Sequence, residues 1–311
     1  MNLQQLRSVR ETVRCGFNLT EVARRLHTSQ PGISRQIREL ETELGVPIFA
    51  RAGKRLLGLT EPGRKVLPLV ERMLENAVNL KRCGDEFALQ GHGTLTISTT
   101  HTQARYLLPR VVRDFRQAHE GVVLHIHQGA PQHVARMLRS GDADIGIATD
   151  ILTAYEDLVT LPCYRWSYCA VVPRGHALAD GQPLTLERLA AFPLISYDAA
   201  YTGRTHIDQA FRQQGLVPNF IILAMNADVI KTYVELDMGV GIVASMAMEG
   251  RSAGDLVAVD ASHLFEGNVT HIAVRRSAFL RAYEFDFITQ FAPQLTRDVI
   301  EQAMHSAEPA A

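Results

Sequence analysis

A stretch near the start of the chain combines helix-start signals with side chains that can read base pairs. It begins at Thr28 and has the sequence TSQPGISRQIREL. Thr28 or Ser29 can cap a helix, and Pro31 fits only in a first helical turn. The outer face then carries glutamine and arginine, which bond base edges, and hydroxyls, which suit phosphates. The predicted DNA contacts are Thr28, Ser29, Gln30, Pro31, Ser34, Arg35 and Arg38.

Neighbouring helices must hold this stretch in place. Apolar residues at helical spacing predict a first helix that ends at Gly16. A second helix begins at Asn18, with Glu21 placed for a capping box, and runs to about His27. The third helix ends at Gly45, and its buried stripe would consist of Ile33, Ile37, Leu40 and Leu44. Two helices joined by such a short turn predict a helix-turn-helix.

A basic hairpin and a long helix follow. Two apolar pairs bracket the segment RAGKR, which predicts a wing with Gly53 in its turn. The side chains expected to follow the DNA backbone are Arg51, Lys54 and Arg55. The next helix starts at Thr60-Glu-Pro62, stays amphipathic for about twenty residues and ends before Gly84. A helix of this kind needs a partner, and a second copy of itself is the simplest one.

Charge is divided unevenly along the 311 residues. Residues 1–60 hold ten Lys/Arg and five Asp/Glu, whereas the remainder holds 22 and 28. A basic module on a mildly acidic body fits a polyanion partner. A helical hairpin with a solvated basic face would give the same pattern, and it is the alternative from the residues alone.

Composition indicates a globular protein of about two domains. Hydrophobic residues make up 46% and charged residues 21%, which excludes a wholly disordered chain. The four cysteines form no CxxC pair, and the opening MNLQQLRSVRETV has no apolar signal-peptide core. The most apolar stretch, Val240 to Met248, is about half as long as a membrane-spanning helix. We therefore expect a cytoplasmic protein with reduced thiols and no membrane contact.

After residue 93 the pattern changes to alternating strands and helices, which predicts mainly parallel sheets covered by helices. One strand ends in Thr99-Thr-His-Thr-Gln103 directly before a helix, Thr149 follows another strand, and Thr202 offers a third hydroxyl. Hydroxyls and an amide facing a helix N-terminus can bind an anion without a cationic side chain. Ordinary helix capping by the same hydroxyls is the alternative.

Several of these segments together resemble the LysR-type transcriptional regulators over nearly the whole chain. The helix-turn-helix stretch TSQPGISRQIRELETELG carries the family resemblance. The segments TTHTQARY from Thr99, YTGR from Tyr201, ADVIKTY from Ala227 and FAPQLTR from Phe291 resemble its CysB branch, activators of sulfur assimilation. The resemblance implies a DNA operator as partner, dimers that associate into a tetramer, and RNA polymerase as a further candidate partner.

The expected architecture has three parts. They are a winged helix-turn-helix (about 1–60), a dimerising linker helix (61–90) and an α/β effector domain (91–311). The effector domain is expected to have two Rossmann-type lobes like those of periplasmic binding proteins. Lobe I would comprise residues 91–163 and 267–311, and lobe II residues 164–266.

The resemblance also implies a small anionic effector between the lobes. Its expected contacts are Thr100, Thr102, Gln103, Thr149, Trp166 and Thr202. For Trp166, simple core packing is the alternative. The implied ligands are O-acetylserine or N-acetylserine, sulfate and thiosulfate. Asp198-Ala-Ala200 and Met225-Asn226 depart from the expected branch pattern, so a regulator of sulfonates or other sulfur sources is the alternative.

An enzyme acting on a small anion and a plain anion-binding protein are the rival classes. Gly250-Arg-Ser252-Ala-Gly254 matches GxSxG but lacks the strand and helix of a nucleophile elbow. His125 and His127 share a strand face, but the sequence places no third metal ligand beside them. No general base accompanies the hydroxyl cluster, and a binding protein of the periplasmic type would need a signal peptide. We therefore expect no enzymatic activity, no metal and no cofactor beyond the effector.

Overall fold

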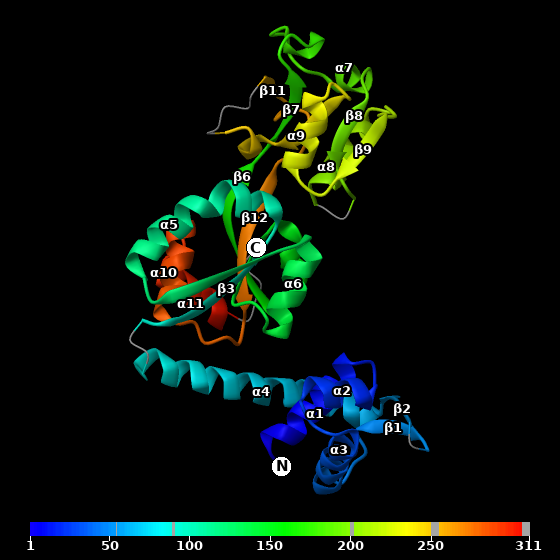
Figure 1. The fold of residues 1–311 in the computed structure, drawn as a ribbon, viewed down its shortest axis with the longest axis vertical. Helices are drawn as coiled ribbons and strands as arrows, with labels where there is room; N and C mark the ends of the chain where they lie inside the picture. Colours follow the sequence, from blue (N-terminus) through cyan, green and yellow to red (C-terminus); the bar gives the residue numbers. More distant parts are fainter. Residues whose placement is uncertain (54, 89–90, 200–201, 250–254, 307–311) are drawn as a thin grey trace. The chain divides into compact units, whose positions relative to one another are not determined.

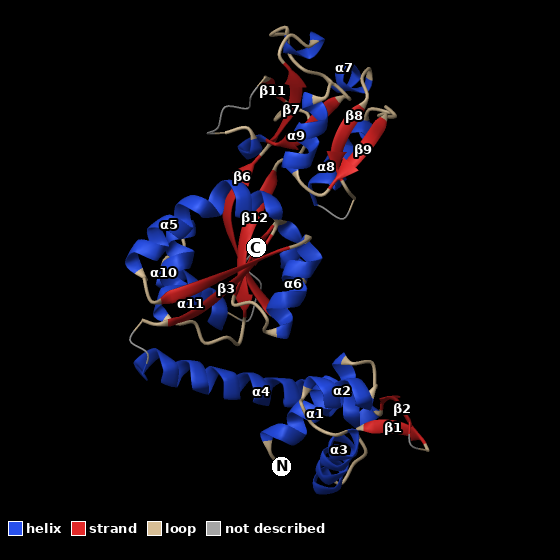
Figure 2. Ribbon diagram, viewed as in Figure 1, coloured by secondary structure: helices blue, strands red, loops and turns tan. Residues whose placement is uncertain are grey.

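The computed structural model describes residues 1–53, 55–88, 91–199, 202–249 and 255–306 (Figure 1). They form two compact units, one of residues 1–88 with 277–279 and one of residues 89–276 with 280–311. Figure 2 shows that the first unit is mostly helical and that the second contains sheets as well as helices. Within the described ranges, no helix is both long and apolar enough to span a membrane.

The first unit contains the predicted helices and wing. Its elements are α1 (Leu3–Arg14), α2 (Leu19–Arg25), α3 (Gln30–Leu44), β1 (Phe49–Ala52), β2 (Arg55–Leu59) and α4 (Glu61–Ala88). The Asn18 side chain caps α2, the Ser29 side chain caps α3, and Gly45 ends α3 in a left-handed conformation. These local signals confirm the expected positions of both helices.

Two details of this unit differ from expectation. Leu44 was expected in the buried stripe of α3, but as the last residue of the helix it is exposed and lies outside the apolar cluster. Glu21 was expected to close a capping box, but its carboxylate instead forms an ion pair with Arg24 at 2.7 Å. Only for Glu21 does another surface contact replace the predicted one.

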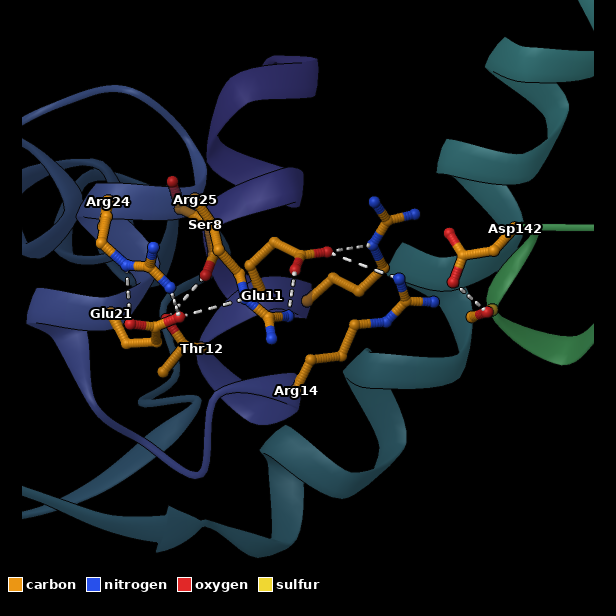
Figure 3. A network of polar contacts seen from close by, with 10 residues as sticks. Ser8, Glu11, Thr12, Arg14, Glu21, Arg24, Arg25 and Asp142 are labelled. Atoms are coloured by element: carbon orange, nitrogen blue, oxygen red, sulfur yellow. Dashed lines mark hydrogen bonds and ion pairs between the residues drawn. The ribbon is translucent and has the colours of Figure 1, made fainter. Parts of the chain in front are cut away.

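Buried Glu11 links α1 to α2 through arginines (Figure 3). Its carboxylate lies 3.1 Å from Arg10 Nε, 3.5 Å from Arg14 Nη1 and 3.7 Å from Arg25 Nη1. Three surrounding cations compensate the desolvation of this carboxylate. The two helices that support α3 are therefore held by charge as well as by apolar packing.

Helix α4 is longer than the sequence indicates. It continues through Gly84 to Ala88, so the predicted end before Gly84 is wrong. A single exposed glycine costs a long helix only about 1 kcal/mol, which the other residues of the helix can offset. At its start, Gly63 is required, because a Cβ there would lie 2.0 Å from the Ile48 carbonyl oxygen.

One side of α4 packs on the helix-turn-helix, and another side is apolar but exposed. Val70 and Leu74 are buried in the apolar cluster of the first unit. Met73, Leu80 and Phe87 follow at seven-residue spacing, and Leu80 and Phe87 are 78% and 80% exposed. A heptad stripe of this kind is typical of a helix that pairs with another helix.

Each lobe of the second unit is built on a five-stranded sheet. Lobe I has the order β4-β3-β5-β12-β6 and lobe II the order β11-β7-β10-β8-β9. The strands of lobe I are β3 (Gly93–Thr99), β4 (Val122–Gln128), β5 (Ile145–Ala148), β6 (Leu158–Trp166) and β12 (Asn268–Arg275). Those of lobe II are β7 (Tyr168–Pro173), β8 (Leu194–Tyr197), β9 (Phe220–Ala224), β10 (Val240–Ala244) and β11 (Leu256–Asp260).

Helices cover both faces of each sheet (Figure 1). Lobe I carries α5 (Leu108–Ala118), α6 (Pro131–Ser140), α10 (Ala282–Phe291) and α11 (Arg297–His305), and lobe II carries α7 (Leu186–Ala190), α8 (Thr202–Gln213) and α9 (Ala227–Glu235). Alternate residues of β7 enter different cores: Ala170 packs with Phe211 of α8, whereas Val171 packs with Ile230 of α9. This alternation explains why the buried strands are apolar throughout.

The prediction of mainly parallel sheets is only half right. The pairs β3–β4, β3–β5, β8–β9 and β8–β10 are parallel. In contrast, β12 is antiparallel to β5 and β6, and β7 is antiparallel to β10 and β11. For β12 and β6 the reason is that β6 leads out of lobe I and β12 leads back into it, so the two strands run in opposite directions.

The stripe on α4 makes self-association testable. We expect Leu80→Glu to shift the protein toward monomer in sedimentation velocity at micromolar concentration, because it places a charge in an apolar helix pair. Lys81→Gln changes the net charge equally but lies off the stripe, and it should sediment like the wild type. Identical masses for the Leu80 variant and the wild type would contradict a pairing role for this stripe.

Candidate functional site

Helix α3 exposes most of the side chains that were predicted to contact DNA. Ile33, Ile37 and Leu40 are buried beneath them. On the outer side, Arg35 Nε donates to Glu39 Oε1 at 2.7 Å, and Arg38 Nε donates to the Ser34 carbonyl oxygen at 3.2 Å. Both arginines are therefore held along the helix surface, with their guanidinium groups open to solvent.

The residues at the start of α3 stabilise the N-terminus of the helix and are also exposed. Ser29 Oγ accepts a hydrogen bond from the Gly32 N–H at 3.3 Å, and Pro31 lies in the first turn. Thr28, Ser29, Gln30 and Pro31 are all exposed. The helix N-terminus and its hydroxyls thus remain accessible to a phosphate oxygen.

On the wing, Arg51 is less available than the sequence indicates. Its Nη2 lies 2.8 Å from Glu41 Oε2, and Glu41 Oε1 accepts the backbone N–H groups of Ile48 and Phe49 at 2.8 and 3.1 Å. Arg51 and Glu41 therefore anchor the wing to α3. Arg55 is exposed on β2, and Lys54 lies outside the described residues.

A small cavity between the two lobes brings together five of the six predicted effector residues. They are Thr100, Thr102, Gln103, Thr149 and Trp166. The other lining residues are His101, Pro131, Tyr197, Gly203 and Met225. Thr202 directly precedes Gly203 at the start of α8, but its side chain lies outside the described ones. Counted over positions open to the centre of a water molecule, the cavity has about 40 Å³, which suits a compact ligand.

Two of the cavity threonines, Thr102 and Thr149, do not cap helices. The side chains of Thr102 and Thr149 precede short helical turns, and neither forms a capping hydrogen bond there. The Thr102 hydroxyl instead hydrogen-bonds Tyr197, which in turn accepts from the Ala244 N–H at 3.1 Å. The capping alternative is therefore wrong for both threonines.

The side chain of Gln103 has protein partners of its own. Its Nε2 donates to Thr270 Oγ1 at 3.0 Å, and Tyr164 donates to its Oε1. Tyr164 and Thr270 lie on β6 and β12, the strands that connect the lobes. Gln103 thus lines the cavity and also holds in place the turn that carries Thr100 and Thr102. The second role could not be predicted from the residues next to it in the sequence.

Two buried polar atoms among the lining residues have no hydrogen-bond partner within the described part of the chain. They are His101 Nδ1 and Trp166 Nε1. Burial, the largest influence, lowers the pKa of His101 below 6.5, although Asp228 acts in the opposite direction. Because unsatisfied buried polar atoms are costly, these two favour a polar occupant. Sequence reasoning missed His101, although it lies inside the threonine motif.

The cavity contains hydrogen-bonding groups but little charge. Among its described lining residues there is no Lys or Arg, and His101 is neutral near pH 7. Pro131 of the lining is in the first turn of α6, whose N-terminus favours negative charge. Elsewhere in the described ranges, no group of three or more His, Cys, Asp or Glu side chains could hold a metal ion. The GxSxG segment at 250–254 lies outside the described residues.

Beside the cavity, a charged cluster joins the two lobes. Asp228 of α9 accepts a hydrogen bond from the Tyr106 hydroxyl at 2.7 Å and pairs with Arg105 at 3.2 Å. Lys231 Nζ lies 3.1 Å from both Asp228 Oδ1 and the Tyr106 hydroxyl. Burial raises the pKa of Asp228, but hydrogen bonds from Tyr106 and Lys231 outweigh it and keep the pKa below 3.8. The carboxylate therefore holds lobe I against lobe II at neutral pH.

This cluster predicts a pH-dependent loss of stability in Asp228→Asn. At pH 5–7 the variant should lose about 1 kcal/mol in urea unfolding, because a partly exposed carboxylate loses its partners. The lowered pKa means that the wild-type advantage is present above pH ~4 and fades as the pH falls further. Glu235→Gln, an exposed carboxylate on the same helix, is the control. A difference that did not change between pH 6 and pH 3 would contradict the role of the Asp228 charge.

Comparison with known proteins agrees with both units. Residues 3–64 match the family described as "Bacterial regulatory helix-turn-helix protein, lysR family", and residues 89–296 match "LysR substrate binding domain". The chain is 53% identical over 307 residues to the HTH-type transcriptional regulator SsuR of Burkholderia cenocepacia, covering 99% of this chain and 100% of that protein. It is 49% identical over 304 residues to CysB of the same species, covering 98% and 97%.

A solved structure resembles the second unit. It is the cofactor-binding domain of the Cbl transcriptional regulator, with a TM-score of 0.66 and 41% identity, covering 69% of this chain and 95% of that one. The relatives are regulators rather than enzymes. The chain therefore belongs to the LysR family of helix-turn-helix transcriptional regulators.

Proposed function

We propose that this regulator controls genes of sulfur assimilation and cysteine synthesis, and that a small sulfur-related anion or acylated serine in the interlobe cavity sets its activity. The observation that carries the proposal is the cavity itself, lined by Thr100, Thr102, Thr149 and Gln103. Similarity to CysB and to the Cbl cofactor-binding domain supports it. The regulator acts in the cytoplasm, where its operator lies.

The chemistry of the lining favours a compact, hydrogen-bond-accepting ligand. Threonine hydroxyls and the Trp166 N–H donate without carrying charge, so the site can hold sulfate, thiosulfate or the carboxylate of O-acetylserine or N-acetylserine. Because the lining comes from both lobes, a ligand there would contact both and favour the arrangement that brings them together. A ligand that binds one arrangement better shifts the population of the two and can thereby alter DNA binding.

A regulator of other sulfur sources, such as sulfonates, is the second candidate. Met225, one of the two departures from the expected branch pattern, lines the cavity and is largely exposed. A flexible apolar side chain at that position changes the shape that a ligand meets. The 53% identity to SsuR also leaves room for a preference that differs from that of CysB.

We further propose that α3 reads the operator and that paired copies of the chain bind related half-sites. Gln30, Ser34, Arg35 and Arg38 lie on the outer face of α3, and Arg55 lies on the wing. Dimers joined through α4 would present two such helices about one DNA turn apart. Association of dimers into a tetramer and contact with RNA polymerase belong to the same proposal.

Substitution of a cavity threonine tests the effector. We expect Thr100→Val to abolish calorimetric binding of sulfate, thiosulfate, O-acetylserine and N-acetylserine, because it removes from the cavity a hydroxyl that would contact the ligand. Operator binding without ligand should stay within a few-fold of wild type. Thr153→Val removes an exposed hydroxyl from the same lobe and is the control. If none of the four binds the wild type, or all bind Thr100→Val equally well, the effector is misassigned.

Two arginine substitutions separate base reading from phosphate contact. Arg35→Ala should cost about 1–3 kcal/mol on the operator and relax preference at one base position. Arg55→Ala should weaken binding to all duplexes and lower the salt dependence by about one unit. Equal losses for Arg35→Ala on operator and random duplex would refute a base-reading role.

A further inference from the structure

The exposed face of α3 contains a carboxylate directly beside the arginine that was assigned to base reading. Glu39 and Arg35 form an ion pair at 2.7 Å, although their side chains are 45% and 80% exposed. Exposed pairs one helical turn apart add little to stability. A negative charge on a DNA-binding face also repels phosphate. The position of Glu39 therefore calls for an explanation other than folding.

Glu39 is held from behind by α1. Its Oε2 accepts a hydrogen bond from Gln5 Nε2 at 3.2 Å, while its Oε1 accepts from Arg35 Nε. Gln5 is itself buried and closes a capping box with Asn2 at the start of α1. Hydrogen bonds from Arg35 and Gln5 lower the pKa of Glu39, so the carboxylate stays ionised at neutral pH. The ionised Glu39 side chain therefore connects Arg35 of α3 to Gln5 of α1.

The contact at Nε determines how Arg35 can meet a base. With Nε–H occupied by Glu39, the two terminal nitrogens remain available for an end-on approach. Two donors in that fork match the O6 and N7 acceptors of guanine. Arg38, one residue before Glu39, donates instead to the hydroxyl and carbonyl oxygens of Ser34, which carry no charge. The two arginines of α3 therefore differ in what holds them.

We propose that Glu39 is a positioning and specificity-determining residue of the DNA interface, which holds Arg35 end-on for guanine and disfavours its use as a phosphate contact. A phosphate must compete with Glu39 for the guanidinium, whereas guanine can bind the terminal nitrogens while Glu39 keeps Nε. The ion pair of Glu39 with Arg35 thereby lowers non-specific affinity for DNA and raises discrimination between bases. This inference rests on α3 being the reading helix and is independent of the identity of the effector.

The test uses full-length protein and selection from duplexes with a randomised central segment, together with salt titration on an unselected random duplex. Glu39→Gln should lower the preference at one guanine position about fivefold or more. It should also steepen the salt dependence on the random duplex by about one unit, because Arg35 becomes free to contact a phosphate. Glu43→Gln removes the same charge from α3 without touching an arginine and serves as control.

Two more variants separate charge from geometry. Glu39→Asp keeps the charge on a shorter side chain, so it should lose base preference like Glu39→Gln while keeping a salt dependence close to wild type. In an Arg35→Ala background, Glu39→Gln should cause no further loss of base preference. Circular dichroism and thermal unfolding establish that each variant is folded before binding is compared.

The outcomes distinguish this inference from the assignment of α3. If Arg35→Ala relaxes the base preference but Glu39→Gln matches Glu43→Gln in both measurements, the role of Glu39 is overturned and α3 remains the reading helix. If Arg35→Ala leaves the base preference intact, both the reading role of Arg35 and the role of Glu39 fail.

Discussion

The antiparallel pairing of β6 with β12 is the constraint on which the effector half of this protein depends. These strands belong to the sheet of lobe I, and the chain passes along them toward lobe II and back. Tyr164 and Thr270 on this pair fix Gln103, and Trp166 lines the cavity opposite Asn268. Asn268 also donates to the Tyr168 hydroxyl, which donates to the Gly203 carbonyl oxygen. One pair of strands thus positions cavity residues of both lobes.

This arrangement fits the proposal that a weakly charged cavity holds an anion. The threonine turn after β3 and the start of α8 are tied to the same two strands, so a ligand between them meets groups whose positions are already set. Preorganised neutral donors bind an anion without the desolvation cost of burying a cation. The nearby cluster of Asp228, Arg105 and Lys231 places its charges outside the lining, where they hold the lobes together.

Local signals in the sequence were sufficient for the boundaries of α2 and α3, but not for the end of α4. Asn18, Ser29 and Gly45 act on their own neighbours, so these boundaries could be predicted from capping chemistry alone. The sheet pairings could not be predicted in this way, because they depend on contacts distant in sequence. Strand β6 is an example, because it contains Pro162, which normally argues against a strand and here lies at a register irregularity opposite His271.

The cavity, too, could be predicted only in part from the sequence. The segment from Thr99 to Gln103 identified its location, but the partners of the Gln103 side chain lie 61 and 167 residues away, so these contacts had no signal in the sequence. His101 was passed over because burial, rather than spacing, leaves its Nδ1 without a partner. The ion pair of Arg51 likewise had no sequence signal, since Glu41 reaches it only after the wing has folded against α3.

The central claim is that a ligand bridges two lobes organised by β6 and β12. Hydrogen–deuterium exchange of the full-length protein, with and without saturating sulfate or N-acetylserine, tests it most directly. The account predicts that residues 99–107 of lobe I and residues 225–235 of lobe II become protected together, with the same dependence on ligand concentration. Protection confined to one lobe, or protection of the two lobes at clearly different concentrations, would contradict it.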